Sequence, residues 1–189
     1  MAAGFGLFNA GGIICMIVGI ALSKPLADKY GKRDIFGTAL MVSTLFILAF
    51  YFFGPKAVEL MYLSQMLHGF FYGITIPLLW AMIADVADYS EWKNNRRATA
   101  IIFSAMMVGL KAGLSIGGAL VTGILSGYGY IPNSETVQLD AAVTGTKMLV
   151  SLFAALPFLL SVSLLFFYPI NKKMETQIES ELKQRRSES

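Results

Sequence analysis

The hydrophobic positions of this chain fall into five long apolar runs separated by short polar connections. Each run is about 20 residues or longer, which at ~1.5 Å of rise per residue lets an α-helix cross the ~30 Å hydrocarbon core of a bilayer. The pattern predicts five membrane-spanning helices, at residues 1–23, 35–54, 58–84, 98–127 and 146–170. We therefore expect an all-α transmembrane bundle over residues 1–170 and a polar tail over residues 171–189.

The composition supports a membrane protein. Of the 189 residues, 56% are hydrophobic and 14% are charged, against about 45–50% and 25% in an ordinary soluble domain. The one cysteine, Cys15, lies inside an apolar run, which excludes a disulfide framework and a cysteine-based metal site. Because the charges sit in narrow blocks between apolar runs, we expect membrane lipid around the chain and no nucleic-acid partner.

The Lys and Arg residues are distributed unevenly over the connections. Residues 24–34, 85–97 and 171–189 hold twelve of the 15, while Lys56 and Lys147 stand on the other side. The positive-inside rule places these three segments in the cytoplasm, so we expect a multi-pass protein of the inner (plasma) membrane with a cytoplasmic carboxyl terminus. Five spans with an outside start predict the carboxyl-terminal portion of a larger protein. A cleavable signal peptide is the alternative for residues 1–23, although no basic segment precedes this run and it exceeds the usual apolar length.

One charged residue lies deep inside a predicted span. Lys111 is thirteen residues after Ala98 and sixteen before Gly127, near the midplane, where insertion of a lysine costs about 2.5–3.5 kcal/mol. Such residues face a bundle interior or a water-filled cavity, usually with a partner. Its helical stripe contains small or polar residues: Ser104, Ser115, Gly118 and Thr122. Since every acid lies in a loop, in the tail or at a span edge, we expect the partner carboxylates on a missing amino-terminal half.

The opposite face of this span carries Gly109, Gly113 and Gly117, a small-xxx-small pattern that predicts close packing against another helix. One face is therefore expected to pack and the other to line a solute pathway. A lysine that only ties two helices together is the structural alternative.

The third predicted span carries a second polar stripe. Its members are Ser64, Gln65, His68, Tyr72 and Thr75. We expect it to face the same cavity as Lys111, which makes Gln65, His68 and Tyr72 candidate pathway residues. A histidine of ordinary helix packing is the alternative for His68, whose unperturbed pKa near 6.5 permits either role. Gly73 and Pro77 are expected to interrupt this span. Breaks or kinks at membrane depth recur at transporter binding sites, but many of them are only packing features.

The first cytoplasmic connection carries part of a loop signature. Asp28, Gly31, Lys32 and Arg33 keep their spacing in G-x-x-x-D-R-x-G-R-[RK], which resembles the signature of the major facilitator superfamily. Gly31 permits a tight turn, and Asp28 can cap a helix start or pair with a basic neighbour.

In the tail, Met174, Ile178 and Leu182 recur at four-residue spacing. This spacing is compatible with a short amphipathic helix at the cytoplasmic surface, and a disordered tail is the alternative.

A longer motif follows the third span. Residues 80–93 read Trp-Ala-Met-Ile-Ala-Asp-Val-Ala-Asp-Tyr-Ser-Glu-Trp-Lys, and Arg97, Lys111 and the Gly-Tyr-Gly-Tyr-Ile-Pro-Asn of residues 127–133 follow. Together they resemble the glycoside-pentoside-hexuronide:cation symporter family, typified by melibiose permease, which has Ala-Asp-x-x-Asp-Tyr-Gly-Glu-[Tyr/Trp]-Lys after its tenth helix and a lysine in its eleventh. The resemblance covers essentially the whole chain and makes the five spans helices 8 to 12 of a twelve-helix transporter.

The resemblance implies the carboxyl-terminal fragment of a secondary active transporter that carries a glycoside or related sugar together with Na⁺ or H⁺ by alternating access. The coupling cation is expected to bind mainly in the missing amino-terminal half, and no other cofactor is implied. The family's cytoplasmic charges are thought to form an inner gate. Its candidate members here are Asp85, Asp88, Glu91, Lys32, Arg33 and Arg97. Solvated loop charge is the alternative for each individual pair, because an exposed ion pair contributes only ~0.2–1 kcal/mol, so a gate needs several pairs acting together.

The sequence also departs from the family. Met106 and Met107 stand where many sugar symporters have Gln-Thr, and Ile76 stands where melibiose permease has a sugar-stacking tryptophan. Met107 is therefore a candidate pathway residue, and a carrier of a lipid or other amphiphilic solute is the alternative function. The spans show no nucleophile–base pair, HExxH or carboxylate pair, so we expect neither an enzyme nor a metal site.

Overall fold

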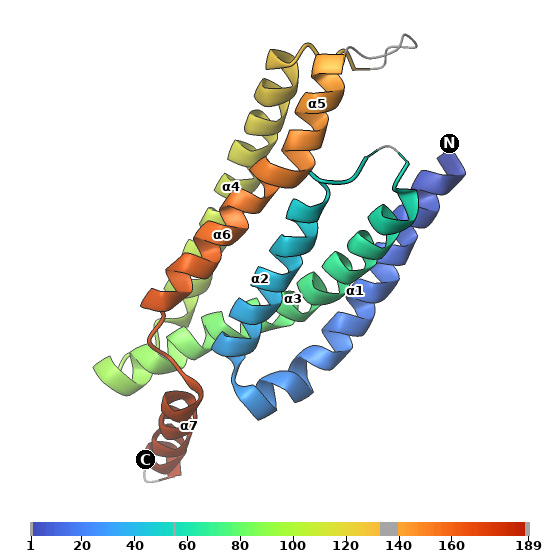
Figure 1. Ribbon diagram of the computed structural model, residues 1–189. Coiled ribbons are helices and arrows are strands. Elements are labelled where there is room, and N and C mark those ends of the chain that lie inside the picture. Colours follow the sequence, from blue (N-terminus) through green and yellow to red (C-terminus); the bar gives the residue numbers. More distant parts are fainter. Residues whose placement is uncertain (1, 55, 133–139, 188–189) are drawn as a thin grey trace.

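The computed structural model describes residues 2–54, 56–132 and 140–187. The elements, in chain order, are α1 (Ala2–Tyr30), α2 (Lys32–Ala49), α3 (Val58–Asn94), α4 (Thr99–Gly127), α5 (Asp140–Met148), the π-helical turn η1 (Leu149–Phe153), α6 (Ala154–Leu164), the 3₁₀ turn η2 (Leu165–Phe167) and α7 (Lys172–Ser187). The segment from α5 to η2 forms one rod, so the described ranges contain five long helices, the short α7 and no strand (Figure 1). The predicted all-α fold is confirmed.

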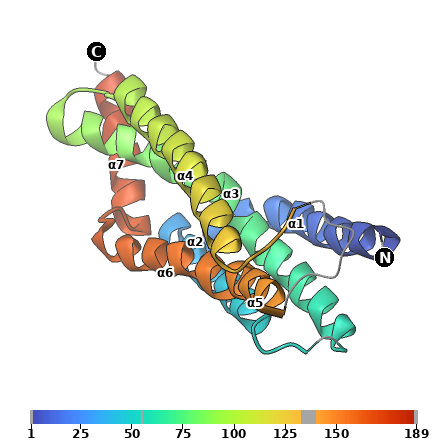
Figure 2. The same cartoon turned by 90° about the horizontal axis from the view of Figure 1, so that it is seen from above.

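Four of the described helices are long and apolar enough to cross a membrane, namely Gly4–Tyr30, Val58–Asn94, Thr99–Gly127 and Asp140–Phe167. Helix α2 is the fifth long helix and has 18 residues. Its first three, Lys32, Arg33 and Asp34, are charged, so its apolar part is shorter than the ~20 residues that span a bilayer. Helix α2 lies between α3 and α6 (Figures 1 and 2), so its short apolar part is flanked by longer helical segments.

The helices extend beyond several of the apolar runs. Helix α1 continues to Tyr30 and α3 to Asn94, because backbone hydrogen bonding does not stop where the side chains become polar. Only Gly31 separates α1 from α2, and its φ of 98° explains why this tight turn needs glycine. Asp28 consequently lies in the last turn of α1 and does not cap a helix start. Helix α2 ends at Ala49, before the predicted end of its run at residue 54. The last rod begins at Asp140, before the predicted start at residue 146.

The expected interruption of the third span is wrong. Helix α3 runs through Gly73 and Pro77 as one element of 37 residues, since a transmembrane helix tolerates proline where neighbouring groups satisfy the freed carbonyl. The irregular backbone lies instead in the rod from α5 to η2, where the π-helical turn η1 directly precedes α6. Pro157 lies four residues after Phe153, the last residue of this π turn.

Glycines bring α1 and α3 into backbone contact. A Cβ atom added to Gly69 would collide with the carbonyl oxygen of Gly12, and one added to Gly73 would collide with that of Met16. On α1, a Cβ atom at Gly19 would collide with the carbonyl oxygen of Phe70. Small residues are what let transmembrane helices approach this closely, so α1 and α3 form the tightest pair of the bundle.

The glycines of α4 behave differently. No described atom lies within 4 Å of a Cβ built at Gly109, Gly113 or Gly117. Helix α4 also contains no buried residue. The packing partner expected for this ladder is therefore not among the described residues, and the close helix contact occurs on α1 and α3 instead.

Helices α1, α2 and α3 share the main apolar core. It consists of Ala27, Ala39, Ile74 and Leu78. The largest fully buried side chains are small and polar: Ser43 and Thr44 on α2, and Ser151 in η1. Thr44 and Ser151 donate hydrogen bonds to backbone carbonyls of their own helices, which lets them pack between helices without an unsatisfied polar group.

Candidate functional site

The predicted pathway residues of α4 lie on an open surface. Ser104, Met107, Lys111 and Ser115 are all exposed. No hydrogen bond or ion pair joins Lys111 to another residue of the described ranges. The Lys111 ammonium group thus lies at about half the length of α4, on a face that no other described helix covers. That arrangement agrees with a counter-charge outside the chain, and the pathway role itself stays a prediction.

The polar stripe of α3 contacts neighbouring helices. Ser64 donates to the carbonyl oxygen of Phe46 on α2, at 2.9 Å. His68 Nδ1 lies 2.7 Å from Ser43 Oγ, also on α2, and the His68 ring stacks on Tyr72 with 5.7 Å between centroids. Gln65 lies against α1, where its Nε2 atom would be 3.0 Å from a Cβ added at Gly12.

These contacts favour the packing alternative for His68. A half-buried imidazole between Ser43 and Tyr72 has the partners that a structural histidine needs, because a buried polar group is costly without a hydrogen bond. Across the described part of the chain, no hydrogen bond or ring contact joins this stripe to Lys111. A shared pathway for Gln65, His68, Tyr72 and Lys111 stays a prediction.

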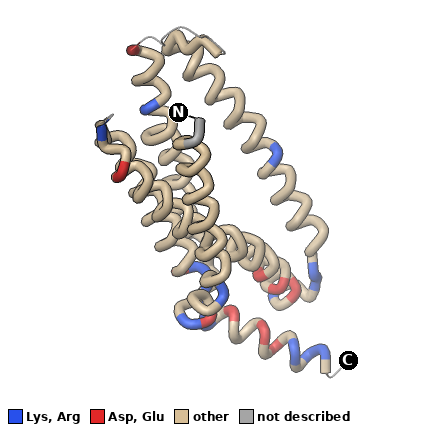
Figure 3. The backbone as a smooth tube through the Cα atoms, turned by 90° about the vertical axis from the view of Figure 1, so that its right-hand side faces the viewer, with Lys and Arg blue, Asp and Glu red and all other residues tan. Residues whose placement is uncertain are grey.

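Charged residues gather at the end of the molecule where α7 lies (Figure 3). We call this group the end cluster; it comprises Lys32, Asp85, Asp88, Glu91, Arg97, Glu175 and Arg186. At its centre, Lys32 Nζ lies 2.6 Å from Asp85 Oδ1 and 2.9 Å from Glu175 Oε1. Burial alone would lower the pKa of Lys32, but the hydrogen bonds and charges of the two carboxylates outweigh it and raise that pKa. Lys32 is therefore firmly cationic at neutral pH.

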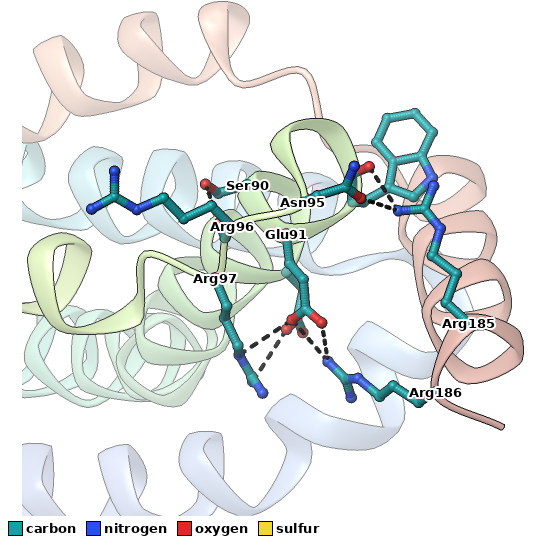
Figure 4. A network of polar contacts seen from close by, with 9 residues as sticks. Ser90, Glu91, Asn95, Arg96, Arg97, Arg185 and Arg186 are labelled. Atoms are coloured by element: carbon teal, nitrogen blue, oxygen red, sulfur yellow. Dashed lines mark hydrogen bonds and ion pairs between the residues drawn. The ribbon is translucent and has the colours of Figure 1, made fainter. Parts of the chain in front are cut away.

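The second part of the end cluster surrounds Glu91. Arg97 lies 3.2 Å from Asp88 Oδ1 and 3.6 Å from Glu91 Oε2, and Arg186 of α7 reaches the same Glu91 oxygen at 2.9 Å. Figure 4 shows Arg97 and Arg186 pointing toward Glu91 from opposite sides. The structure thus brings together five of the six predicted gate residues. The sixth, Arg33, has no ion pair within the described ranges.

Sequence reasoning missed the contribution of α7. Its Glu181 accepts a 2.6 Å hydrogen bond from Trp92 Nε1, and its Arg185 donates to the carbonyl oxygen of Trp92 at 3.2 Å. Ile178 and Leu182 are buried beneath it. The four-residue apolar spacing indicated a helix here, and the disordered alternative is wrong for residues 172–187. That spacing could not identify the surface on which the helix docks.

Lys172 ties the start of α7 to the end of α1. Its Nζ atom donates to the carbonyl oxygens of Asp28 and Lys29, at 2.6 and 2.8 Å. These carbonyls belong to the last turn of α1, where intrahelical donors run out and a cation is favourable. The loop signature of residues 24–33 is therefore held to α7 at this point.

A neutral residue at position 32 is expected to loosen α7. Lys32→Gln leaves the partly buried Asp85 and Glu175 close together without their cation, and loss of the partner of a buried polar group costs about 1–3 kcal/mol. In the purified chain, trypsin should then cut after Lys172 or Lys173 several-fold faster than in the wild type. Lys24→Gln is the matched control, because Lys24 is exposed and forms no ion pair with described residues. Equal cleavage in both variants would contradict the role of Lys32.

Known proteins provide an independent comparison. A family model described as "MFS/sugar transport protein" matches residues 2–172. The chain is 34% identical over 80% of its length to an uncharacterized 29.9 kDa protein of Pseudescherichia vulneris, and 33% identical over 77% to the inner membrane symporter YicJ of Escherichia coli K12. It is 28% identical over 89% to the putative glycoside/cation symporter YagG of the same strain. These matches span 54%, 31% and 36% of the three relatives.

Proposed function

We propose a function on one premise: the chain belongs to the MFS/sugar transport protein family. The resemblance of the chain to the glycoside-pentoside-hexuronide:cation symporter family is confirmed. Two of its relatives are named as symporters, and one of these is named as a putative glycoside/cation symporter. The broad function is therefore solute transport across a membrane. The more specific statements that follow are our proposal.

The chain is the carboxyl-terminal part of a longer secondary active transporter and supplies helices 8 to 12 of twelve. Support comes from its five long helices and from the 31% and 36% of the lengths of YicJ and YagG that it matches. The transported solute is a glycoside or related sugar, carried together with Na⁺ or H⁺. The end cluster and the carboxyl terminus lie in the cytoplasm, because the basic residues concentrate at that end.

The observation that carries this proposal is the exposed Lys111 on α4, for which the described chain offers no acidic partner. In a full transporter, carboxylates of the amino-terminal half pair with this ammonium group near the midplane. Binding of the coupling cation among those carboxylates relieves the pairing and completes the solute site, and rocking of the halves then exchanges access. One monovalent cation gains about 2.3 kcal/mol per 100 mV, which supports roughly fifty-fold accumulation of a neutral solute.

The end cluster acts as the inner gate of this cycle. Arg97 and Arg186 both bind Glu91, and Lys32 binds both Asp85 and Glu175. A charged side chain that leaves one ion pair therefore has a second partner close by. Single exposed pairs contribute only ~0.2–1 kcal/mol. A network of several such pairs can hold the cytoplasmic mouth closed and still open within one transport cycle.

Uptake assays test the proposed function. Cells that produce the complete transporter should accumulate a labelled glycoside or related sugar only in the presence of Na⁺ or of a proton gradient. Collapse of the membrane potential together with the cation gradient should abolish this accumulation. If a panel of glycosides, pentosides and hexuronides shows no cation-dependent uptake, the sugar-symport proposal fails.

A carrier of a lipid or other amphiphile is the second candidate. Met107 is 42% exposed on the stripe of α4 that contains Lys111, and a flexible thioether suits an apolar solute better than a sugar hydroxyl. The same cells assayed with a labelled amphiphile separate the two candidates. Cation-dependent uptake of the amphiphile without uptake of any sugar would favour the second.

A further inference from the structure

An apolar cavity of about 490 Å³ lies at the end of the bundle opposite the end cluster. The end of α2, the turn after it, the first turns of α3 and the start of the last rod surround it. Its apolar walls come from Phe50, Phe53, Met61, Val143 and Val150. A cavity of this size and lining is within the range of small-molecule sites, and neither candidate solute pathway includes it.

One charge stands at this cavity. Lys147 is the only charged residue of its described lining, and no ion pair joins it to another residue in the described ranges. Its Nζ atom lies 5.5 Å from the centroid of the Tyr51 ring. A cation–π contact orients an ammonium group without neutralising it, so the cavity combines apolar walls with an available positive charge.

A second apolar groove adjoins the first. It encloses about 350 Å³ beside Phe5, Phe8, Val58 and Tyr62, and it shares Phe50 and Met61 with the larger cavity. No charged residue contributes to its described lining. Two apolar grooves that meet at a common wall, with one cation beside the larger, match two hydrocarbon chains attached to one anionic headgroup.

The backbone holds Lys147 at this position. The Tyr128 ring packs directly against Gly145, where no Cβ atom would fit, and the Tyr128 hydroxyl lies 3.4 Å from Met148 Sδ. The carbonyl oxygen of Lys147 accepts a 2.6 Å hydrogen bond from Ser151, inside the π turn η1. π turns inserted into α-helices are frequent at functional sites. Lys147 is thus fixed between a tight helix contact and an irregular turn.

We propose that this surface binds an anionic phospholipid, with its two acyl chains in the two grooves and its phosphate beside Lys147. The end cluster lies at the opposite ends of α2 and α3, so with that cluster in the cytoplasm, as in the proposed function, the lipid comes from the outer leaflet. The ammonium group supplies the complementary charge for the phosphate, and the apolar walls replace the lipid environment of the chains. The site does not depend on the identity of the transported solute.

Native mass spectrometry of the purified 189-residue chain in detergent tests this site. The probes are phosphatidylglycerol and phosphatidylcholine with identical acyl chains, added at equal concentration. Wild-type protein should retain phosphatidylglycerol about fivefold better, which is the effect of one basic residue at a lipid surface. Lys147→Gln should remove this preference. Lys56→Gln is the matched control, since Lys56 is exposed at the same end of the molecule and lines neither groove.

Further arms separate the alternatives. Val143→Trp, at a 58% exposed position of the cavity wall, should reduce retention of both phospholipids by filling the larger groove. Circular dichroism verifies that each variant keeps its helices, and Lys147→Gln alone decides the question if the tryptophan variant misfolds. Equal retention by Lys147→Gln and Lys56→Gln would overturn the proposal. Retention of lysophosphatidylglycerol or glycerol phosphate equal to that of phosphatidylglycerol would overturn the two-chain arrangement.

Discussion

Replacement of Lys111 by glutamine in the complete transporter is expected to abolish cation-coupled uptake. The interaction that keeps an ammonium group at mid-membrane must offset an insertion cost of about 2.5–3.5 kcal/mol. Loss of an interaction of this size changes an equilibrium constant on the order of a hundredfold. In the proposed mechanism, Lys111→Gln removes the charge with which the carboxylates of the other half pair, so cation binding no longer changes that pairing. Insertion should be unaffected, because glutamine is less costly in the bilayer than lysine and Lys111 has no partner among the described residues.

Initial rates of labelled-solute uptake, normalised to the amount of protein in the membrane, measure this effect. Lys56→Gln provides the matched control, because it removes a lysine that lies in the turn before α3 and outside every predicted pathway. The control should transport at the wild-type rate. Wild-type uptake by Lys111→Gln would instead assign Lys111 to helix packing.

Substitution of Gly69 by leucine should destabilise the bundle more than any other single change considered above. The carbonyl oxygen of Gly12 occupies the space that the new Cβ atom requires, and a backbone carbonyl cannot rotate away as a flexible side chain can. Overpacking of a well-packed interior typically costs about 1–3 kcal/mol. We expect the upper end of this range, because α1 must move away from α3 along its length.

The unfolding midpoint of the purified chain in detergent measures this change. Gly113→Leu is the control, because it makes the same substitution on α4, where no described atom lies within 4 Å of the new Cβ. It should leave the midpoint of this chain nearly unchanged. A comparable loss of stability in both variants would contradict the assignment of the tight contact to α1 and α3.

The two glycine patterns show the limit of sequence reasoning about helix packing. Gly109, Gly113 and Gly117 have the regular four-residue spacing that predicts close packing, yet they face open space in the described chain. Gly69 and Gly73 have the same spacing and do pack closely. Spacing states which residues share a helix face, but it contains no information about which other helix meets that face.

The end cluster shows what could and could not be predicted about the candidate site. Lys32 and Asp85 were expected near each other because both lie in connections that the positive-inside rule places on the cytoplasmic side. The structure shows an ion pair between them. Glu175 and Arg186 were not expected there, because a charged amphipathic helix is compatible with many docking positions. The contacts of α7 with other helices, such as those with Lys32 and Glu91, identify its place.

The sequence by itself determined that the chain is helical, that it contains helices long and apolar enough to cross a membrane, and that one lysine lies at about half the length of such a helix. Length, hydrophobicity and charge decide those properties locally, since each depends on the free energy of moving one segment from water into hydrocarbon. The tertiary structure alone decided that α1 and α3 share the tight contact, that His68 packs against α2, and that α7 closes the end cluster. Those properties depend on the shape and charge of two surfaces together, and residues distant in the chain supply the second surface.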